Sequence, residues 1–349
     1  MNILGALLFP FTLIYDLVTR VRNYLFDSGY KRSFKFEANV IGVGNITVGG
    51  TGKSPMVEYL IRLLSSQYSI ATLSRGYGRS TKGFKITDES DNALTVGDEP
   101  YQFYNKFKDI TVAVGEERAA AIPFILAEKN PDIIILDDAF QHRYVEPSFN
   151  IMLTDYSRLF YDDFVLPSGR LREARKGANR ADVIVVTKCP DNISANEMDA
   201  IEKRIQTYAP NSIVTFSGIR YLPAEPVFVN GQFSENIILF SGIANNKHLM
   251  EYLSTHFALM DEYFFPDHHG YTKKDLQSIE ERFQRMPMAD KCLLTTEKDM
   301  IKLLNSSLGS TIEHLPVFYI PIETYFIKNG KTFDEMVLKS INKYSDNPN

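Results

Sequence analysis

A glycine-rich loop between a strand and a helix is the feature that most constrains how this chain folds. Residues 39–43, AsnValIleGlyVal, form a predicted strand, residues 44–55 have the sequence GlyAsnIleThrValGlyGlyThrGlyLysSerPro, and a helical run follows. In such loops glycines let backbone N–H groups converge on phosphate oxygens, a lysine reaches the β and γ phosphates, and a hydroxyl can ligate Mg²⁺. A glycine-rich turn without a nucleotide is the alternative, which the strand-loop-helix context disfavours. We therefore expect phosphates to be bound by Gly49, Gly50, Thr51, Gly52, Lys53 and Ser54.

The loop and a second motif together indicate which nucleotide is bound. Thr47 stands where the standard spacing has glycine, and the glycines that follow supply the missing flexibility. Residues 187–191, ThrLysCysProAsp, resemble the guanine-binding motif of GTPases. Pro190 occupies the position of the guanine-binding aspartate, so we expect ATP rather than GTP.

Two carboxylates end an apolar strand farther along the chain. Residues 132–138 have the sequence AspIleIleIleLeuAspAsp. In P-loop enzymes an acid at this place holds or orients the metal that bridges the phosphates. Aspartates also end strands as simple caps, but the upstream Lys53 favours the metal. We predict a Mg²⁺ site formed by Ser54, Asp137 and Asp138, and the sequence leaves open which aspartate is nearer the metal.

Three polar loops offer groups for a substrate, and the first two directly follow predicted strands. They are residues 73–79, residues 139–143 and residues 166–180, the last with five basic residues and one acid. Ligands of open α/β sheets bind beyond the carboxyl ends of the strands. A charge run is usually solvated surface and a histidine is often only structural, but beside a phosphate site these side chains can hold an anionic substrate. The candidate substrate-binding residues are Arg75, Gln141, His142, Arg170 and Arg172.

Short β-branched runs alternate with helical stretches from Asn39 onward, the pattern of βαβ units on a mostly parallel sheet. This predicts an α/β, P-loop NTPase-like fold with flanking helices. We expect an N-terminal helix over 1–26, a nucleotide-binding domain over 27–220, a β-linker over 221–232 and a smaller α/β domain over 233–349. The expected strands are 39–43, 69–73, 110–114, 132–136, 149–154, 182–187 and 212–216 in the first domain, and 236–240, 256–260, 291–295 and 316–320 in the second.

The first 26 residues are a separate segment. Apolar residues recur there at spacings of three and four, the period of one helical face. Pro10, Asp16, Arg20 and Arg22 interrupt the run before the ~20 apolar residues that span a bilayer, and no signal-peptide pattern is present. We expect Pro10 to start or kink an amphipathic helix. That helix either packs on its own domain or lies in a lipid interface with its basic flank near anionic headgroups.

Composition excludes several classes of protein. Apolar residues make up 44% of the 349, enough to bury the cores of about two domains, so the chain is neither disordered nor fibrous. A net charge of -5 is too acidic for a protein that coats nucleic acid, and we expect no such partner. The two cysteines lie far apart without metal-ligand neighbours, which favours an intracellular protein over a disulfide framework.

In their order along the chain, these segments resemble the tetraacyldisaccharide 4'-kinase family over nearly the whole length. Two motifs of the second domain take part, PheProAspHisHisGlyTyrThr and ThrGluLysAsp. Ser54 replaces a more usual threonine, and Arg170 and Ala174 stand where prolines are common. The remaining motifs are residues 44–55, SerArgGlyTyrGlyArg, GlyAspGluPro, AspAspAlaPheGlnHisArg, LeuProSerGlyArgLeuArgGlu and AlaAspValIleValValThrLys.

The resemblance implies a lipid A pathway kinase that uses ATP and Mg²⁺ to phosphorylate the 4'-hydroxyl of a tetraacylated glucosamine disaccharide 1-phosphate. It also implies a peripheral protein, whose N-terminal helix associates with the cytoplasmic face of the bacterial inner membrane, and we expect a monomer. By resemblance Asp98 is the catalytic base, His268 orients it, and Lys53 completes the catalytic set. The structural alternative is that Asp98 only caps a helix and His268 only braces its loop.

A P-loop ATPase switch or metallochaperone is the competing function, since it too needs Lys53, Ser54 and Asp138. Such a switch would carry a dimer interface or paired metal-binding cysteines. A kinase instead needs a proton acceptor near the γ-phosphate and a place for a lipid, for which Asp98, His268 and the apolar N-terminus are candidates. A non-enzymatic membrane scaffold leaves the phosphate loop unexplained.

Overall fold

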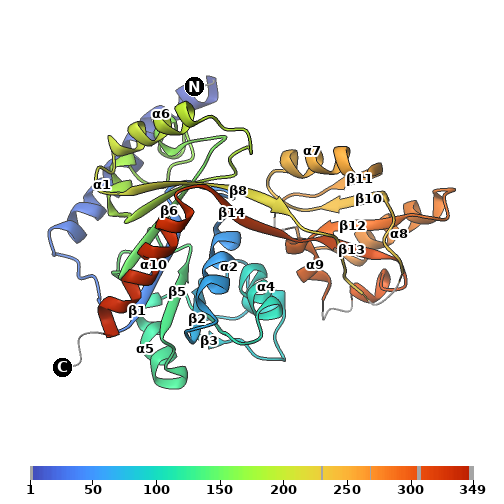
Figure 1. Ribbon diagram of the computed structural model, residues 1–349, viewed down its shortest axis with the longest axis horizontal. Helices are drawn as coiled ribbons and strands as arrows, with labels where there is room; N and C mark the ends of the chain where they lie inside the picture. Colours follow the sequence, from blue (N-terminus) through green and yellow to red (C-terminus); the bar gives the residue numbers. More distant parts are fainter. Residues whose placement is uncertain (1–2, 229–230, 268, 305–307, 346–349) are drawn as a thin grey trace.

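The chain folds into two α/β lobes that lie side by side (Figure 1). The computed structural model describes residues 3–228, 231–267, 269–304 and 308–345. Its strands form a nine-stranded sheet in the larger lobe and a five-stranded sheet in the smaller one. Two long strands, β8 (Ile213–Tyr221) and β14 (Ile322–Lys328), run between the lobes. The α/β class predicted from the alternation of strands and helices is confirmed.

The larger sheet has the order β14-β8-β7-β6-β1-β5-β2-β4-β3. Its strands are parallel except for β14 and β3 at the two edges. Helices cover both faces of such a sheet, which explains why its strands are continuous apolar runs without alternation. Besides β8 and β14 the strands are β1 (Asn39–Asn45), β2 (Ile70–Ser74), β3 (Lys85–Ile86), β4 (Thr111–Val114), β5 (Ile133–Asp137), β6 (Phe149–Asp155) and β7 (Val183–Thr187).

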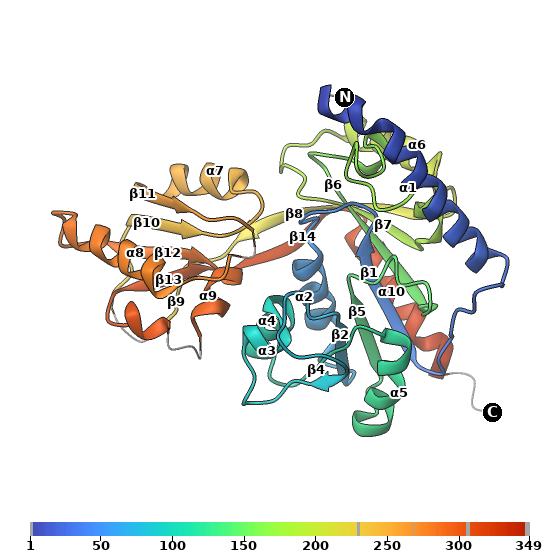
Figure 2. The same cartoon turned by 180° about the vertical axis from the view of Figure 1, so that it is seen from behind.

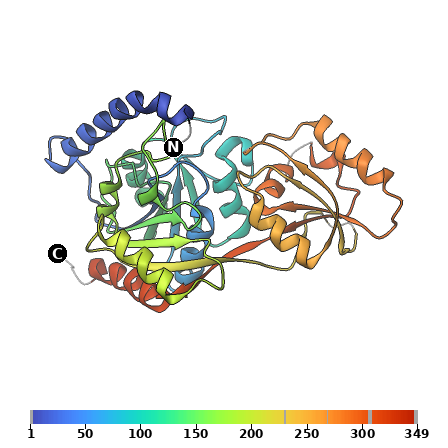
Figure 3. The same cartoon turned by 90° about the horizontal axis from the view of Figure 1, so that it is seen from above.

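Two helices on opposite sides of the larger lobe, α1 (Ile3–Asp27) and α10 (Gly330–Ser345), come from the two ends of the chain (Figure 3). The core between β1 and α10 combines Met56 and Leu60 with Phe333 and Val337, all fully buried. The other helices of this lobe are α2 (Lys53–Leu64), α3 (Ala93–Val96), α4 (Asp98–Lys106), α5 (Arg118–Lys129), α6 (Ala195–Gln206), and the short 3-10 helices η1 (Phe160–Asp162) and η2 (Arg175–Arg180).

The smaller sheet has the order β11-β10-β12-β13-β9, with β9 antiparallel to its neighbour. The predicted strands of this lobe all correspond to observed ones, although the predicted strand from residue 256 begins later, because His256 ends a helix. Its elements are β9 (Glu225–Pro226), β10 (Asn236–Ser241), α7 (Lys247–His256), β11 (Ala258–Phe264), α8 (Lys273–Arg285), β12 (Cys292–Thr296), α9 (Glu297–Leu303), η3 (Gly309–Thr311) and β13 (Val317–Ile320).

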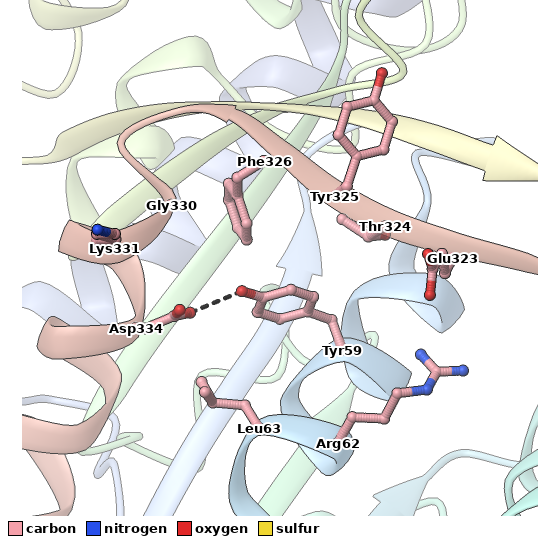
Figure 4. A pocket seen from close by; sticks show the side chains of 10 residues that line it. All are labelled: Tyr59, Arg62, Leu63, Glu323, Thr324, Tyr325, Phe326, Gly330, Lys331 and Asp334. Carbon is pink, nitrogen blue, oxygen red and sulfur yellow. Dashed lines mark hydrogen bonds between the residues drawn. The ribbon is translucent and has the colours of Figure 1, made fainter.

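The C-terminal segment returns to the larger lobe, which the predicted boundary at residue 233 does not take into account. Strand β14 pairs antiparallel with β8, and α10 then packs on the larger sheet. Figure 4 shows the join to α2, where the Tyr59 hydroxyl donates a 2.8 Å hydrogen bond to Asp334 and the Tyr59 ring meets Phe326 edge-on. An N-terminal helix, strand pairing around residues 221–226 and a smaller lobe are present. The division of the chain into independent domains stays a prediction.

Helix α1 is amphipathic, and its apolar face points outward. Phe11, Ile14 and Val18, which belong to the predicted apolar face, are 61%, 63% and 60% exposed, while Thr12 on the opposite face is only 5% exposed. Figure 2 shows α1 along the outer surface of the larger lobe. Pro10 lies inside the helix and does not start it. Within the described part of the chain, no helix has the length and apolar character to span a membrane.

Candidate active site

The glycine loop lies between β1 and α2, at the centre of the larger sheet. Gly49 and Gly52 have φ angles of 108° and 83°, a region that favours glycine. Helix α2 begins at Lys53 without a side-chain cap, so the N–H groups of its first turn point toward the loop. An uncapped helix N-terminus of this kind attracts phosphate. All six predicted phosphate-binding residues therefore lie in one loop and one helical turn.

Neighbouring strands fix the shape of this loop. The Thr187 hydroxyl donates to the Thr51 carbonyl at 2.9 Å, and the Asn45 amide donates to the Thr51 hydroxyl at 2.6 Å. The Lys188 ammonium donates to the Gly50 carbonyl and also pairs with Asp155. The ThrLys pair that resembles a guanine-binding motif thus supports the backbone of the glycine loop.

Thr47 can stand at the glycine position because it forms an isolated β-bridge there and does not have a positive φ. Thr47 forms an antiparallel bridge with Leu171, flanked by bonds from Val48 N–H to the Arg170 carbonyl at 2.8 Å and from Arg172 N–H to the Ile46 carbonyl at 2.7 Å. Any residue type adopts that conformation. The pairing also places the basic loop, residues 166–180, directly along the glycine loop.

The paired aspartates lie at the carboxyl end of β5, next to β1. Lys53 Nζ is 3.7 Å from Asp138 Oδ1, and Arg172 Nη1 lies 3.1 Å and 3.2 Å from the two oxygens of Asp138. Burial opposes ionisation of Asp138, but Lys53 and Arg172 outweigh it and hold the pKa of this carboxyl below its usual range. The structure thus joins Lys53, Asp138 and Arg172, from three separate motifs, in one charged cluster.

Asp137 has the free oxygen that a metal would need. Its Oδ1 is buried and accepts no hydrogen bond from any described residue, whereas its Oδ2 is 3.4 Å from the Ser74 hydroxyl. Burial and the charge of Asp138 raise the pKa of Asp137 to about 7. Mg²⁺ prefers a few carboxylates together with phosphate oxygens and water. No three acidic, histidine or cysteine side chains of the described residues form a ready-made metal cage, which suits an ion shared with a nucleotide.

Gln141 and His142 follow the paired aspartates in the chain, and the environments of the two side chains differ. Gln141 donates to the Asn45 carbonyl at 2.7 Å and accepts from Arg172 at 3.2 Å, so it links the glycine loop to the basic loop. His142 is half-buried, and burial together with nearby arginines, Arg118 among them, lowers its pKa to about 4. The imidazole is therefore neutral at pH 7. Its Nε2 has no partner within the described residues.

The predicted arginines differ in exposure. Arg75 is exposed on the loop after β2 and contributes positive charge to the surroundings of Arg118 and His142. Arg170 pairs with the glycine loop only through its backbone and exposes its side chain. Of the three predicted substrate-binding arginines, Arg172 is the one that forms an ion pair with the paired aspartates.

Asp98 starts helix α4 and faces the smaller lobe. The preceding Gly97 has a φ of 99°, and its backbone passes so close to Gly76 that a side chain on Gly97 would lie 3.2 Å from it. These glycines bring the GlyAspGluPro and SerArgGlyTyrGlyArg motifs together. Lys302 Nζ of α9 is 4.0 Å from Asp98 Oδ2, and Lys298 Nζ of α9 is 3.2 Å from Glu99.

The loop that contains His268 approaches the same place. Asp267 lies 3.6 Å from Lys298, and the ring of His269 stacks on Phe265. His268 itself lies outside the described residues, so the predicted contact with Asp98 stays a prediction.

Arg118 and Glu173 belong to the site but were not predicted from the sequence. The Arg118 side chain is buried at the start of α5, its Nη2 donates to the Asp137 carbonyl at 3.3 Å, and its Nε has no partner among the described residues. Glu173 is buried and accepts bonds from Gln141, Arg180 and Asn23 of α1. Glu173 is the one acid among the five basic residues of the basic loop. This difference in charge is the sequence signal that could have identified it. No sequence signal identifies Arg118 as a site residue, because an arginine that starts a helix is usually exposed.

Comparison with known proteins identifies the family. A family model described as tetraacyldisaccharide-1-P 4'-kinase matches residues 4–342. The tetraacyldisaccharide 4'-kinase of Flavobacterium johnsoniae is 44% identical, over 98% of both chains, and that of Bacteroides thetaiotaomicron is 41% identical, over 92% of this chain and 89% of the relative. The crystal structure of LpxK from Aquifex aeolicus in complex with ATP has a TM-score of 0.76 and 27% identity, covering 97% of this chain and 100% of that one. The chain therefore belongs to the tetraacyldisaccharide-1-P 4'-kinase family.

Proposed function

We propose that this chain transfers the γ-phosphoryl group of ATP to the 4'-hydroxyl of a tetraacylated glucosamine disaccharide 1-phosphate, a step of lipid A biosynthesis. Family membership over residues 4–342 supports this activity. The observation that carries it is the charged cluster at the glycine loop, where Lys53 and Arg172 face Asp138. A relative solved with ATP supports the choice of nucleotide.

The cationic side chains of the cluster stabilise charge during transfer. Backbone N–H groups of the glycine loop hold the phosphates, Lys53 reaches the β and γ phosphates, and Arg172 and Arg118 add positive charge near the γ position. Asp137, through its unpartnered oxygen, and Ser54 would hold Mg²⁺, and the ion would neutralise charge on the bridging phosphate oxygens. Asp138 keeps Lys53 in place.

Asp98 is the proposed base for the attacking hydroxyl. As the sugar oxygen bonds to the γ-phosphorus, the bond from phosphorus to the ADP oxygen breaks and the hydroxyl proton passes to the Asp98 carboxylate. Resemblance to the family assigns this role to Asp98 and an orienting role to His268. The gathering of Lys302, Lys298 and Asp267 around the start of α4 supports a site that both lobes build.

The lipid substrate and the membrane are proposed to meet at α1. Its apolar side chains point to solvent, as in helices that lie in a lipid interface. A cavity of about 710 Å³ lies beside the contact between α1 and the basic loop. Its lining combines Phe9, Leu13 and Phe164 with three cations and two acids, namely Arg20, Arg175, Lys176, Asp16 and Asp163. An acylated, anionic sugar fits such a lining.

We infer that this chain lies peripherally on the inner membrane, and we propose that it does so on the cytoplasmic face. A monomeric state and the absence of a nucleic-acid partner also stay predictions. The net charge of -5 supports the second of these.

A direct assay separates the kinase from an ATPase switch. The protein is incubated with ATP, Mg²⁺ and a detergent-dispersed tetraacyl disaccharide 1-phosphate, and the lipid is analysed by mass spectrometry. A product heavier by one phosphate supports the proposal. Hydrolysis of ATP without any phosphorylated lipid would overturn it in favour of the switch.

A further inference from the structure

A half-buried lysine joins three elements at the contact between the lobes. Lys106, the last residue of α4, has its Nζ 2.8 Å from Glu58 Oε2 and 2.5 Å from Glu297 Oε1. Glu58 belongs to α2, the helix that follows the glycine loop, and Glu297 is the first residue of α9 in the smaller lobe. Figures 1 and 2 show α2, α4 and α9 next to one another at this junction. One ammonium group thus ties the nucleotide-binding helix to the second lobe.

The two carboxylates depend on this lysine to different degrees. The side chains of Glu58 and Glu297 are 1% and 7% exposed. Glu58 also accepts bonds from Gln102 at 2.8 Å and from Arg62 at 3.1 Å. Glu297 Oε2 has no partner among the described residues, so Lys106 is the cation that holds Glu297. A buried carboxylate that loses its cation strongly destabilises the folded state, so the contact between the lobes depends on Lys106 lying beside Glu297.

The cluster is remote from the phosphates but connects elements that carry site residues. Glu58 follows Lys53 by about one and a half helical turns, and Lys106 lies roughly 12 Å along α4 from Asp98. Neither residue belongs to the glycine loop or to the first turn of α2, where the phosphates are proposed to bind. At the other end of α4, Lys302 of α9 faces Asp98. The position of α9 relative to α2 and α4 decides where Lys302 and Lys298 stand.

We infer that Lys106 is a positioning residue for phosphoryl transfer. By holding Glu297 against Glu58 it keeps α9 in register with α2 and α4, so that the smaller lobe presents its side chains to Asp98. This inference rests on the proposed function. Loss of the lysine is expected to slow the chemical step while ATP binding stays nearly unchanged, because the glycine loop keeps its own supports.

A charge-balanced variant separates this role from a merely structural one. Lys106→Met alone leaves Glu297 buried without its cation, so it is combined with Glu297→Gln, while Glu58 keeps Arg62 and Gln102. Lys106→Arg restores the cation. The matched control is Lys328→Met, because Lys328 also lies between two carboxylates, Asp199 at 2.8 Å and Glu202 at 3.0 Å, but away from α9.

The readouts are kcat for lipid phosphorylation, KM for ATP, and the unfolding temperature. We expect kcat of Lys106→Met/Glu297→Gln to fall about 10- to 100-fold, the effect of a displacement near 1 Å, with KM for ATP within about threefold of the wild-type value. Lys106→Arg should recover most of the rate, and Lys328→Met should match the wild type. If the double variant does not fold, Glu297→Gln alone is measured, since it retains the Lys106–Glu58 pair.

The outcomes distinguish the inference from the function on which it rests. Wild-type kcat in a folded double variant would overturn the role of Lys106 alone, and so would an equal loss in Lys328→Met. A wild-type protein that makes no phosphorylated lipid would instead overturn the proposed function. A rate loss at unchanged unfolding temperature, reversed by Lys106→Arg, supports the inference.

Discussion

Lys302 of the smaller lobe faces Asp98 of the larger lobe, with Nζ 4.0 Å from Oδ2. The Lys302 side chain is only 8% exposed, and its ammonium lies between Asp98 and Asp299 of its own helix, the latter at 3.0 Å. The proposed base therefore has its charge partner on the other lobe. Phosphoryl transfer is expected to require both lobes, whereas the glycine loop that holds the nucleotide belongs to one.

Asp98→Asn is expected to lower kcat about 10²- to 10⁴-fold, since the hydroxyl proton loses its acceptor, while KM for ATP changes little. Steady-state kinetics with the lipid substrate measures both values. An unchanged kcat would assign the base role to another group, with Glu99 the first to test. If His268 acts through Asp98, the double variant with His268→Ala should be little slower than Asp98→Asn alone. Strictly additive losses would contradict that pairing.

Lys53→Ala is expected to reduce phosphoryl transfer by at least 10²- to 10³-fold, because charge on the β and γ phosphates loses its partner. Asp138 keeps Arg172 at 3.1 Å, so the fold should survive. Turnover measured beside Lys82→Ala, an exposed lysine of the same lobe, checks this expectation. Near-normal turnover in Lys53→Ala would remove the kinase assignment.

Asp137→Asn is expected to raise the Mg²⁺ concentration for half-maximal activity about 10- to 100-fold. The reason is that Asp137 Oδ1 is buried without a protein partner, whereas both oxygens of Asp138 face Arg172. Activity is titrated with Mg²⁺ for Asp137→Asn and Asp138→Asn in parallel. A larger shift in Asp138→Asn would make Asp138 the closer metal ligand.

The triple variant Ile14→Gln, Leu17→Gln, Val18→Gln is expected to lose binding to anionic vesicles and keep basal ATP hydrolysis. Each apolar side chain contributes about 1 kcal/mol or more when it enters the lipid interface. Vesicle sedimentation measures the change. Asn23→Ala, which removes the 2.7 Å bond to Glu173 on the inward face, is the control and should still sediment. Equal sedimentation of triple variant and wild type would place the membrane contact elsewhere.

Glu297 is expected to make the protein less stable as pH rises from about 5 to 8. Burial, then the charge of Glu58, raises the pKa of Glu297 to about 7, against the favourable charges of Lys106 and Arg62. A carboxyl whose pKa is raised on folding stabilises the protein fully below its unfolded pKa, and this contribution is lost as pH rises through 7. The loss is about 3 kcal/mol at most.

Glu297→Gln should flatten that pH dependence. Unfolding temperatures of the variant and the wild type are compared at pH 5 and pH 8, so that titrating groups unaffected by the substitution cancel. Parallel pH profiles for the two proteins would show that Glu297 does not titrate in this range.

The sequence predicted what is encoded locally. Each strand predicted from an apolar run corresponds to an observed strand. Lys53 lies at the start of a helix, as the glycine-rich motif predicts. The placement of β14 was missed, because residues 322–328 form a short half-apolar run and nothing in such a run specifies which sheet it joins. Periodicity likewise found the apolar face of α1 but not its direction. That direction depends on polar contacts such as Arg22 to the Gln141 carbonyl, from distant parts of the chain.

The return of β14 and α10 to the larger lobe has a consequence for how the protein folds while it is synthesised. The chain leaves the larger sheet through β8 and re-enters it through β14, so the smaller lobe is an insertion within the larger one. Phe333, Val337 and Ile341 of α10 fill the same core as Met56 and Leu60 behind the glycine loop. On the ribosome, the glycine loop is therefore translated well before residues 333–341, and its hydrophobic support is complete only after those residues have been synthesised.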